Sequence, residues 1–213
     1  MRLNTVIIAD DSANCNISEL CVGLKDSTIH LLNQYQASHN DVAVQNLVLL
    51  SDISKEHISD KLSQVNQNNF ISFWYGHGDK NAFRLANDNM ISTTENYYLF
   101  TNAIVYTFSC YVGMELAEVL VENGVKAFVG YTSAVECPLG LDKTTIKLAM
   151  VFVDSFINGK SVNDAMYDLR KAYDDAVYDE NIEPFLRGYF QNNRDALVLR
   201  GDGNLIINDI HIH

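Results

Sequence analysis

Short runs of almost wholly apolar residues, separated by longer amphipathic stretches, restrict the fold of this chain more than any other feature. The runs lie at 4–9, 46–52, 70–75, 103–109 and 125–132, with a shorter one at 196–202. Apolar runs of this length are typical of parallel strands that are buried on both faces. The sequence therefore predicts an α/β fold, in which a mostly parallel central sheet of about six strands has helices on both faces.

The stretches between the apolar runs have helical periodicity. Ile58, Leu62 and Val65 recur at i, i+4 and i+7 after a capping Ser54. Periodic stretches of this kind cover about 16–36, 54–65, 114–122 and 142–176. The first three predict one helix each, and the last predicts a pair of helices separated at Gly159.

Length and composition fit a single unit of this kind. The chain has 213 residues, 47% of them hydrophobic, with only two prolines and no internal repeat. A chain of this length supports one substantial hydrophobic core. We therefore expect one domain over residues 1–213.

Composition also narrows the cellular setting. No apolar run approaches the roughly 20 residues of a membrane-spanning helix, and "MRLNTVIIADDS" lacks the features of a signal peptide. Four cysteines without CxxC pairing argue against a zinc site and for reduced thiols: Cys15, Cys21, Cys110 and Cys137. A net charge of −12 disfavours nucleic acid as a partner. We expect a cytoplasmic protein that has no metal site and acts away from membranes.

A histidine and a cysteine follow two successive apolar runs. His77 lies between two glycines directly after the run at 70–75, and Cys110 follows the run at 103–109. The catalytic groups of parallel α/β sheets gather beyond the carboxyl ends of the strands. If these two strands are neighbours in the sheet, we expect the two side chains to meet at one edge.

These two residue types can act together as a nucleophile and its base. A thiol becomes an effective nucleophile as the thiolate, which a nearby imidazole and a helix N-terminus both favour. Cys110 precedes the helix expected over 114–122, and His77 could hold the proton and later protonate a leaving amine. Gly78 leaves a bare backbone N–H beside the imidazole, so the N–H groups of Gly78 and Cys110 could form an oxyanion hole.

Each residue taken alone has an ordinary alternative interpretation. A cysteine at the end of a buried strand is usually a small apolar side chain, and a histidine in a turn is usually solvated. Cys15 and Cys21 are expected to be core or surface thiols. The remaining histidines are expected on or beside helices or in a terminal tail: His30, His39, His57, His211 and His213. Cys137 is the only rival nucleophile, but Pro138 separates it from any following helix.

The order and spacing of several motifs resemble the caspase-like cysteine peptidases. They are "WYGHGD", the insert "AFRLANDNMIS", a strand ending in "SC", then "NGVKAFVGYTS", "GKSVNDAMYDLRKAY" and "ALVLRGDGNLII". The bacterial branch, with gingipains, clostripain and CHAT-domain peptidases, is the most similar. The resemblance spans about 70–205, and residues 1–66 fit it only as alternating strands and helices. The caspase signature around the cysteine is absent, and Phe108 occupies the place of an acidic residue in metacaspases.

This resemblance implies a three-layer sandwich and a cysteine endopeptidase. The peptide bond would be cleaved through an acyl-enzyme on Cys110, with His77 as its partner and no cofactor. The expected partners are a protein or peptide substrate and a regulatory protein or activating event. By family analogy the setting would be bacterial defence.

The residues that frame the expected substrate pocket are acidic or neutral. In caspases, arginines after the first and fifth strands bind an acidic side chain. Here Asp10 and Asp11 follow the first strand, and Ser133 and Glu136 follow the fifth. Carboxylates in such a pocket favour lysine or arginine before the scissile bond. Asp10 and Asp11 are equally good candidates, although Asp-Asp-Ser is also an ordinary turn or capping sequence.

Other functional classes compete with the peptidase interpretation. A catalytically silent module of the same fold would bind or regulate without cleaving, and the presence of His77 and Cys110 argues against it. A receiver domain would need an aspartate where Gly76-His77-Gly78 stands. An α/β-hydrolase would need a G-x-S-x-G elbow, which is absent.

Overall fold

A computed structural model describes the chain except for residues 13–15, 53, 87, 139 and 213, so Cys15 and His213 lie outside the described residues. The strands are β1 (Arg2–Ala9), β2 (Ala43–Leu50), β3 (Phe70–Tyr75), β4 (His77–Asp79), β5 (Ala82–Leu85), β6 (Asp88–Ser92), β7 (Ala103–Phe108), β8 (Ala127–Tyr131) and β9 (Leu197–Gly201). The α-helices are α1 (Ser18–Ser38), α2 (Lys55–Val65), α3 (Glu115–Glu122), α4 (Asp142–Ile157), α5 (Val162–Val177) and α6 (Pro184–Ala196). Two short 3-10 helices are η1 (Tyr97–Phe100) and η2 (Ile207–Ile210).

A six-stranded sheet in the order β2-β1-β3-β7-β8-β9 forms the centre of the molecule. The first five strands in that order are parallel, and β9 runs antiparallel to β8. Every residue of the central strands β3 and β7 is buried, which explains why their sequences are almost entirely apolar. The predicted mostly parallel sheet of about six strands is confirmed.

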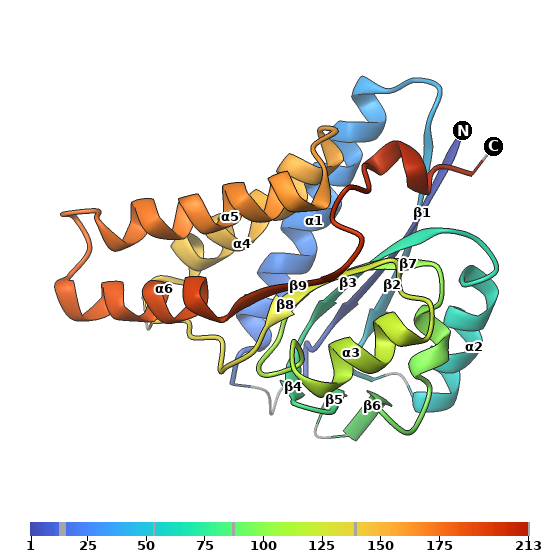
Figure 1. The fold of residues 1–213 in the computed structure, drawn as a ribbon, viewed down its shortest axis with the longest axis horizontal. Coiled ribbons are helices and arrows are strands. Elements are labelled where there is room, and N and C mark those ends of the chain that lie inside the picture. The colour runs from blue at the N-terminus through green and yellow to red at the C-terminus, as the bar shows by residue number, and fades with distance from the viewer. Residues whose placement is uncertain (13–15, 53, 87, 139, 213) are drawn as a thin grey trace.

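Helices cover both faces of this sheet (Figure 1). One face packs against α1, α4 and α5, and the other packs against α2 and α3. Two hydrophobic layers result, one on each side of the sheet. Helix α6 lies alongside α5 and adds Phe190 and Ala196 to the first of these layers.

Four buried tyrosines place their hydroxyl groups inside the layer under α1, α4 and α5. Tyr106 donates to the carbonyl oxygen of Ala149 at 2.7 Å. The Tyr131 and Tyr173 hydroxyls lie 3.0 Å apart, and that of Tyr75 lies 2.7 Å from Thr28. Burial raises the pKa of all four phenols, because the phenolate is poorly stabilised away from water.

Some elements differ from the sequence-based expectations. Strand β2 begins at Ala43, three residues before the apolar run. The insert at 82–92 forms the expected hairpin, β5-β6, but its union with β4 in a separate small sheet was not expected, and neither was α6. His211 is not in a free tail: it is buried, with Nε2 3.1 Å from the Tyr35 hydroxyl.

The two ends of the chain lie side by side (Figure 1). Arg2 and Ile212 exchange two backbone hydrogen bonds, of 3.0 and 2.8 Å.

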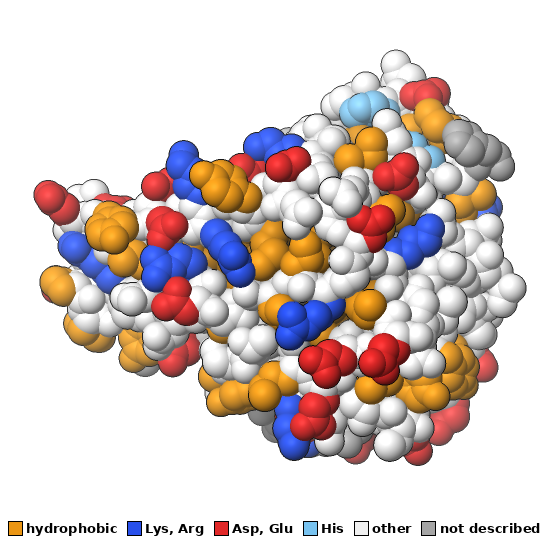
Figure 2. Space-filling view, in the orientation of Figure 1, with side chains coloured by type: hydrophobic (Ala, Val, Ile, Leu, Met, Phe, Trp, Pro, Cys, Tyr) orange, Lys and Arg blue, Asp and Glu red, His pale blue; other side chains and the backbone are white. Residues whose placement is uncertain are grey.

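Side chains of both charge signs are scattered over the face in Figure 2. No helix in the described part of the chain has the length and apolar character needed to cross a membrane.

Candidate active site

The pairing of β3 with β7 brings His77 and Cys110 to the same edge of the sheet. Tyr75 lies opposite Phe108 in the last matched pair of these strands. His77 and Cys110 each follow that pair by two positions. The strands are neighbours at the centre of the sheet, which is the condition that the sequence alone left open.

Gly78 packs directly on the segment that carries the cysteine. A Cβ atom at this position would lie 2.8 Å from the carbonyl oxygen of Cys110 and 2.5 Å from Cγ1 of Val112. Only glycine allows the backbone to approach so closely. His77 is the first residue of β4 and is half-buried, so the close approach of Gly78 holds the histidine segment against the cysteine segment.

The loop after β8 holds the turn around Cys110. The half-buried Cys110 Sγ accepts a hydrogen bond from the backbone N–H of Val135, with an N–S distance of 3.4 Å. The next residue, Tyr111, has a φ of 61°, a left-handed conformation that is uncommon outside glycine. Its N–H donates to the carbonyl oxygen of Ser133 at 2.9 Å. Backbone strain of this kind clusters at functional sites.

The backbone N–H of Cys110 differs from the N–H groups at the start of α3 in whether it already has an acceptor. Among the described residues, none accepts a hydrogen bond from the N–H of Cys110. Helix α3 begins at Glu115, and the N–H of Leu116 in its first turn donates to the carbonyl oxygen of Lys80 at 2.8 Å. The start of α3 therefore anchors the β4–β5 turn, so fewer of its N–H groups are available to a thiolate than the sequence suggested.

The environment of Cys137 does not favour a nucleophile. Its thiol lies 3.4 Å from Asp142 Oδ1 and 3.5 Å from Thr145 Oγ1. Burial raises the pKa of the Cys137 thiol by more than the Thr145 hydrogen bond lowers it, and the neighbouring Asp142 carboxylate raises it further. Cys21 is buried in the core. Cys110 is therefore the better candidate.

A hollow of about 470 Å³ is lined by Tyr111, the residue that follows Cys110. Residues from three segments line it: Tyr111 after β7, Thr132, Ser133, Ala134 and Glu136 after β8, and Asn192, Asp195 and Ala196 in α6. Two of the predicted pocket residues, Ser133 and Glu136, thus share one hollow next to the cysteine. None of these lining residues is a lysine or arginine.

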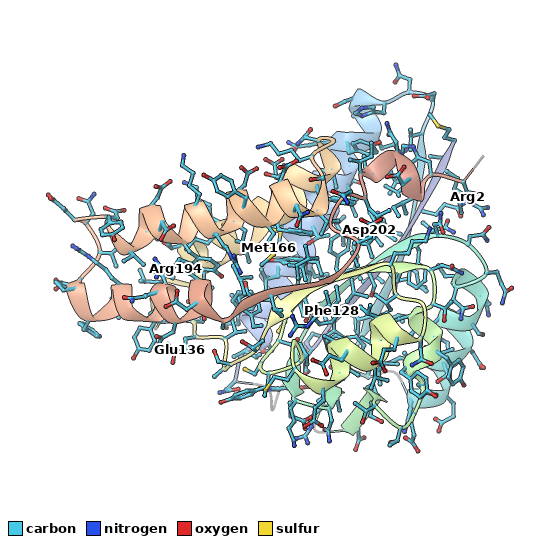
Figure 3. The ribbon with its side chains drawn as sticks, in the orientation of Figure 1. Arg2, Phe128, Glu136, Met166, Arg194 and Asp202 are labelled. Atoms are coloured by element: carbon cyan, nitrogen blue, oxygen red, sulfur yellow. The ribbon has the colours of Figure 1, made fainter. Side chains whose placement is uncertain are left out.

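Helix α6 fixes the loop that carries Glu136, which Figure 3 labels beside the helix. The buried side chain of Asn193 accepts from the Glu136 N–H at 2.8 Å and donates to the Glu136 carbonyl oxygen at 2.7 Å. Asn192 donates to the Glu136 carboxylate at 3.1 Å. Asp195 pairs with Arg194 at 2.9 Å, so Glu136 is the carboxylate of the hollow that no cation in the described residues neutralises.

Sequence reasoning did not find these α6 residues. The available signal was Pro184, since proline is common in the first turn of a helix. Within the described residues, no three His, Cys, Asp or Glu side chains group as a metal site would require.

The two predicted pocket aspartates lie elsewhere. Asp10 and Asp11 follow β1, which borders β3 on the side away from β7 and β8, and neither lines the hollow. Asp10 is fully buried. Asp11 is exposed and accepts from the Ser51 N–H at 3.0 Å and the Ser51 hydroxyl at 2.5 Å. The slight burial of Asp11 opposes ionisation, but the Ser51 hydrogen bonds outweigh it and lower the pKa of its carboxyl group.

Comparison with known proteins identifies the fold. No family model and no curated protein matches the sequence. Solved structures with the same fold include the Arg-specific cysteine proteinase gingipain R, at 15% identity and a TM-score of 0.63. A complex of RgpB pro- and mature domains from Porphyromonas gingivalis matches at 14% identity and a TM-score of 0.56, and a structure described as a protease matches at 15% and 0.61.

These likenesses cover 95% of this chain but only 47%, 48% and 48% of the three solved chains. The chain therefore spans about half the length of the proteins it resembles. At identities this low, the likeness shows the fold. The predicted caspase-like three-layer architecture is confirmed.

Proposed function

We propose that this chain is a cysteine endopeptidase in which Cys110 is the nucleophile and His77 moves the proton. One observation carries the proposal: Gly78, adjacent to His77, packs on the backbone of Cys110 at the carboxyl ends of two neighbouring parallel strands. This edge is where α/β sheets place their reactive groups. The fold shared with gingipain R, itself described as a cysteine proteinase, supports the same chemistry.

The reaction follows from the groups at this edge. The Cys110 thiolate attacks the scissile carbonyl carbon, forming a C–S bond and moving the carbonyl π electrons onto oxygen. The N–H groups of Cys110 and Gly78 would stabilise that oxyanion. When the C–N bond breaks, the leaving amine takes a proton from His77. Water, deprotonated by His77, then attacks the thioester carbonyl and releases the acid and the thiolate.

The hollow beside Cys110 supports a preference for a basic residue before the cleaved bond. Glu136 supplies a carboxylate, and the ring of Tyr111 supplies an aromatic wall that can also attract a cation. A charge-assisted hydrogen bond contributes about 1.5–3 kcal/mol, or about 10- to 100-fold in specificity. Ser133 completes the polar lining. Exposed Asp11 remains a second candidate for substrate contact, and buried Asp10 does not.

A regulatory protein segment is part of the proposal. One structure with this fold is a complex of a pro-domain with a mature domain. A segment of similar kind would cover the open edge where Cys110 lies and would leave when the enzyme is activated. The proposed location is cytoplasmic, because nothing in the proposed chemistry needs a disulfide or a membrane.

The test is a peptide-library cleavage profile of the purified protein beside Cys110→Ala, His77→Ala and Cys137→Ala. The first two variants should each lose hydrolysis to a similar extent, and the double variant should lose little more, since the residues act as a unit. Cys137→Ala should keep activity. If Cys137→Ala loses hydrolysis and Cys110→Ala keeps it, the nucleophile is Cys137 and not Cys110. If the folded wild-type protein is alkylated at Cys110 by iodoacetamide but cleaves no peptide in the library, the chain is a catalytically silent binding module.

Specificity has its own measurement, the ratio of kcat/KM for matched Arg and Gln peptides. Glu136→Gln keeps the shape of the side chain and removes its charge. It should reduce that ratio by about 10-fold or more, while hydrolysis of the Gln peptide changes little. Two results would contradict the basic preference: an Arg-to-Gln ratio of kcat/KM that Glu136→Gln leaves unchanged, or a preference of the unmutated protein for acidic peptides.

A further inference from the structure

Asp10 is a fully buried carboxylate that the proposed reaction does not use. It has no exposed surface, and among the described residues no lysine, arginine or histidine forms an ion pair with it. Burial of a carboxylate without a cation is costly unless hydrogen bonds replace its water. Its contacts should therefore show what it holds in place.

The carboxylate of Asp10 joins two loops. Its Oδ1 accepts hydrogen bonds from the Ser12 N–H at 3.2 Å and the Ser12 hydroxyl at 2.6 Å. Its Oδ2 accepts from the N–H of Ala86 at 3.1 Å. The backbone N–H of Asp10 donates to the carbonyl oxygen of Tyr75, the last residue of β3, at 2.9 Å. Asp10 thus links the end of β1, the end of β3 and the turn after β5.

The histidine segment lies between the last two of these contacts. Gly76 separates Tyr75 from His77, and a Cβ atom at Gly76 would lie 3.4 Å from Cβ of Asp10 and 3.2 Å from the carbonyl oxygen of Arg84. Arg84 is the partner of His77 in the β4–β5 pair, and Ala86 follows it by two residues. Ala86 has a φ of 48°, so its left-handed turn needs an external contact to hold it.

We infer that Asp10 is a positioning residue, which fixes the β4–β5 hairpin so that His77 faces Cys110. The inference rests on the proposed Cys–His pair. The start of α3 holds the other end of the same hairpin, where Leu116 donates to Lys80. Clamped at both ends, the hairpin cannot move His77 away from the cysteine without breaking one of these contacts.

Asp10→Asn is the most informative substitution, because it keeps the size of the side chain. The amide oxygen can keep the Ser12 contacts, but the NH₂ group then meets the N–H of Ala86, donor against donor. The contact to the hairpin should be lost selectively. Asp168→Asn is the control, since Asp168 in α5 also accepts a serine hydroxyl at 2.6 Å, from Ser155 in α4, and pairs with Lys160.

Two measurements distinguish a role of Asp10 in positioning His77 from a role in stabilising the fold alone. The first is the split between kcat and KM for an Arg peptide. We expect kcat of Asp10→Asn to fall about 10- to 100-fold, as for a misplaced catalytic group, while KM changes by less than about 2-fold. The second is the rate of iodoacetamide labelling of Cys110 at about pH 6.5 relative to about pH 9, on either side of the titration of an ordinary thiol.

His77→Ala defines the largest expected fall in that labelling ratio. Asp10→Asn should lower the ratio in the same direction, by at least one third of the His77→Ala effect on a logarithmic scale, and Asp168→Asn should leave it unchanged. If His77→Ala lowers the ratio but Asp10→Asn does not, the positioning role is wrong and the Cys–His pair stands. If His77→Ala itself has no effect, the proposed pair fails, and the positioning role fails with it.

Ser12→Ala serves if Asp10→Asn does not fold. It removes the hydroxyl contact at 2.6 Å and leaves the carboxylate in place. We expect a smaller fall in the labelling ratio and in kcat, again with unchanged KM. A lower melting temperature with a wild-type labelling ratio and wild-type kcat in Ser12→Ala would mean that the Asp10 cluster is only structural.

Discussion

A single missing side chain, at Gly78, determines how close the two halves of the candidate site can come. In Gly78→Ala the new Cβ would meet the carbonyl oxygen of Cys110 at 2.8 Å. That neighbour is backbone and cannot rotate away, so His77 and Cys110 must separate. We expect kcat/KM to fall by about 100-fold or more, as for other misplacements of about 1 Å.

The control for this prediction is Gly188→Ala in α6, where nothing lies within 4 Å of the new Cβ. It should keep full activity and gain up to about 1 kcal/mol of stability from helix propensity. Circular dichroism would show that both variants are folded. Wild-type activity in Gly78→Ala would mean that the site does not depend on this close approach.

The cysteines should also differ in how their labelling depends on pH. Burial and the Asp142 carboxylate raise the pKa of Cys137, so its thiolate forms only at higher pH than that of an ordinary thiol. Near neutral pH, we expect iodoacetamide to label Cys110 well before Cys137, with Cys137 gaining ground as the pH rises. Mass spectrometry of timed digests measures both sites. Faster labelling of Cys137 at neutral pH would reverse the assignment of the nucleophile.

At the scale of elements, α6 supports the hollow that contains Glu136. Asn193→Ala would leave the N–H and carbonyl groups of Glu136 without their partners. We expect the free energy of unfolding to fall by about 1–3 kcal/mol, and KM for Arg peptides to rise because the loop carrying Glu136 loosens. Denaturant unfolding and steady-state kinetics measure the two effects.

Asn192→Ala is the comparison for this substitution. It removes one exposed contact to the Glu136 carboxylate and leaves the loop backbone bonded. Its cost in stability should stay within about 0.5 kcal/mol. Equal losses of stability in the two variants would show that the buried bonds of Asn193 do not fix the loop.

The elements that could be predicted from the sequence are those marked by a pattern of apolar residues within the element itself. The central strands are buried along their whole length and mostly apolar because helices cover both faces, and their parallel order alone brings His77 and Cys110 to one edge. Helix α6 was missed because its sequence is rich in polar residues and includes Gly188, and it is stabilised by packing on α5 rather than by its own pattern.

The supporting contacts of the site were not predictable for a different reason. Asp10 reaches Ala86 across 76 positions of sequence, and Asn193 reaches Glu136 across 57. Such hydrogen bonds depend on the geometry of the finished fold and leave no trace in local periodicity. The same limit explains why Asp10 looked like a pocket residue: an aspartate after a strand reads alike whether it faces substrate or a buried turn.

At the scale of the whole molecule, the buried tyrosines predict sensitivity to alkali. Their pKa values are raised in the folded state, so the unfolded chain releases these protons first, and stability must fall as the pH rises above about 10. We expect the late part of the phenolate absorbance change to coincide with loss of the circular dichroism signal. Complete ionisation of all 11 tyrosines in a chain that keeps its signal would contradict this.

The backbone hydrogen bonds between Arg2 and Ile212 bring the two ends of the chain together, so the path of the chain is nearly a closed ring. Both ends leave the molecule where β1 begins, whereas the candidate site lies where the parallel strands end, so anything attached at either end emerges on the side opposite His77 and Cys110. A short covalent link across the bridge would circularise the chain without shifting a strand. The ring could then be reopened at the solvent-exposed Gly159 between α4 and α5, giving a circular permutant with the same candidate site.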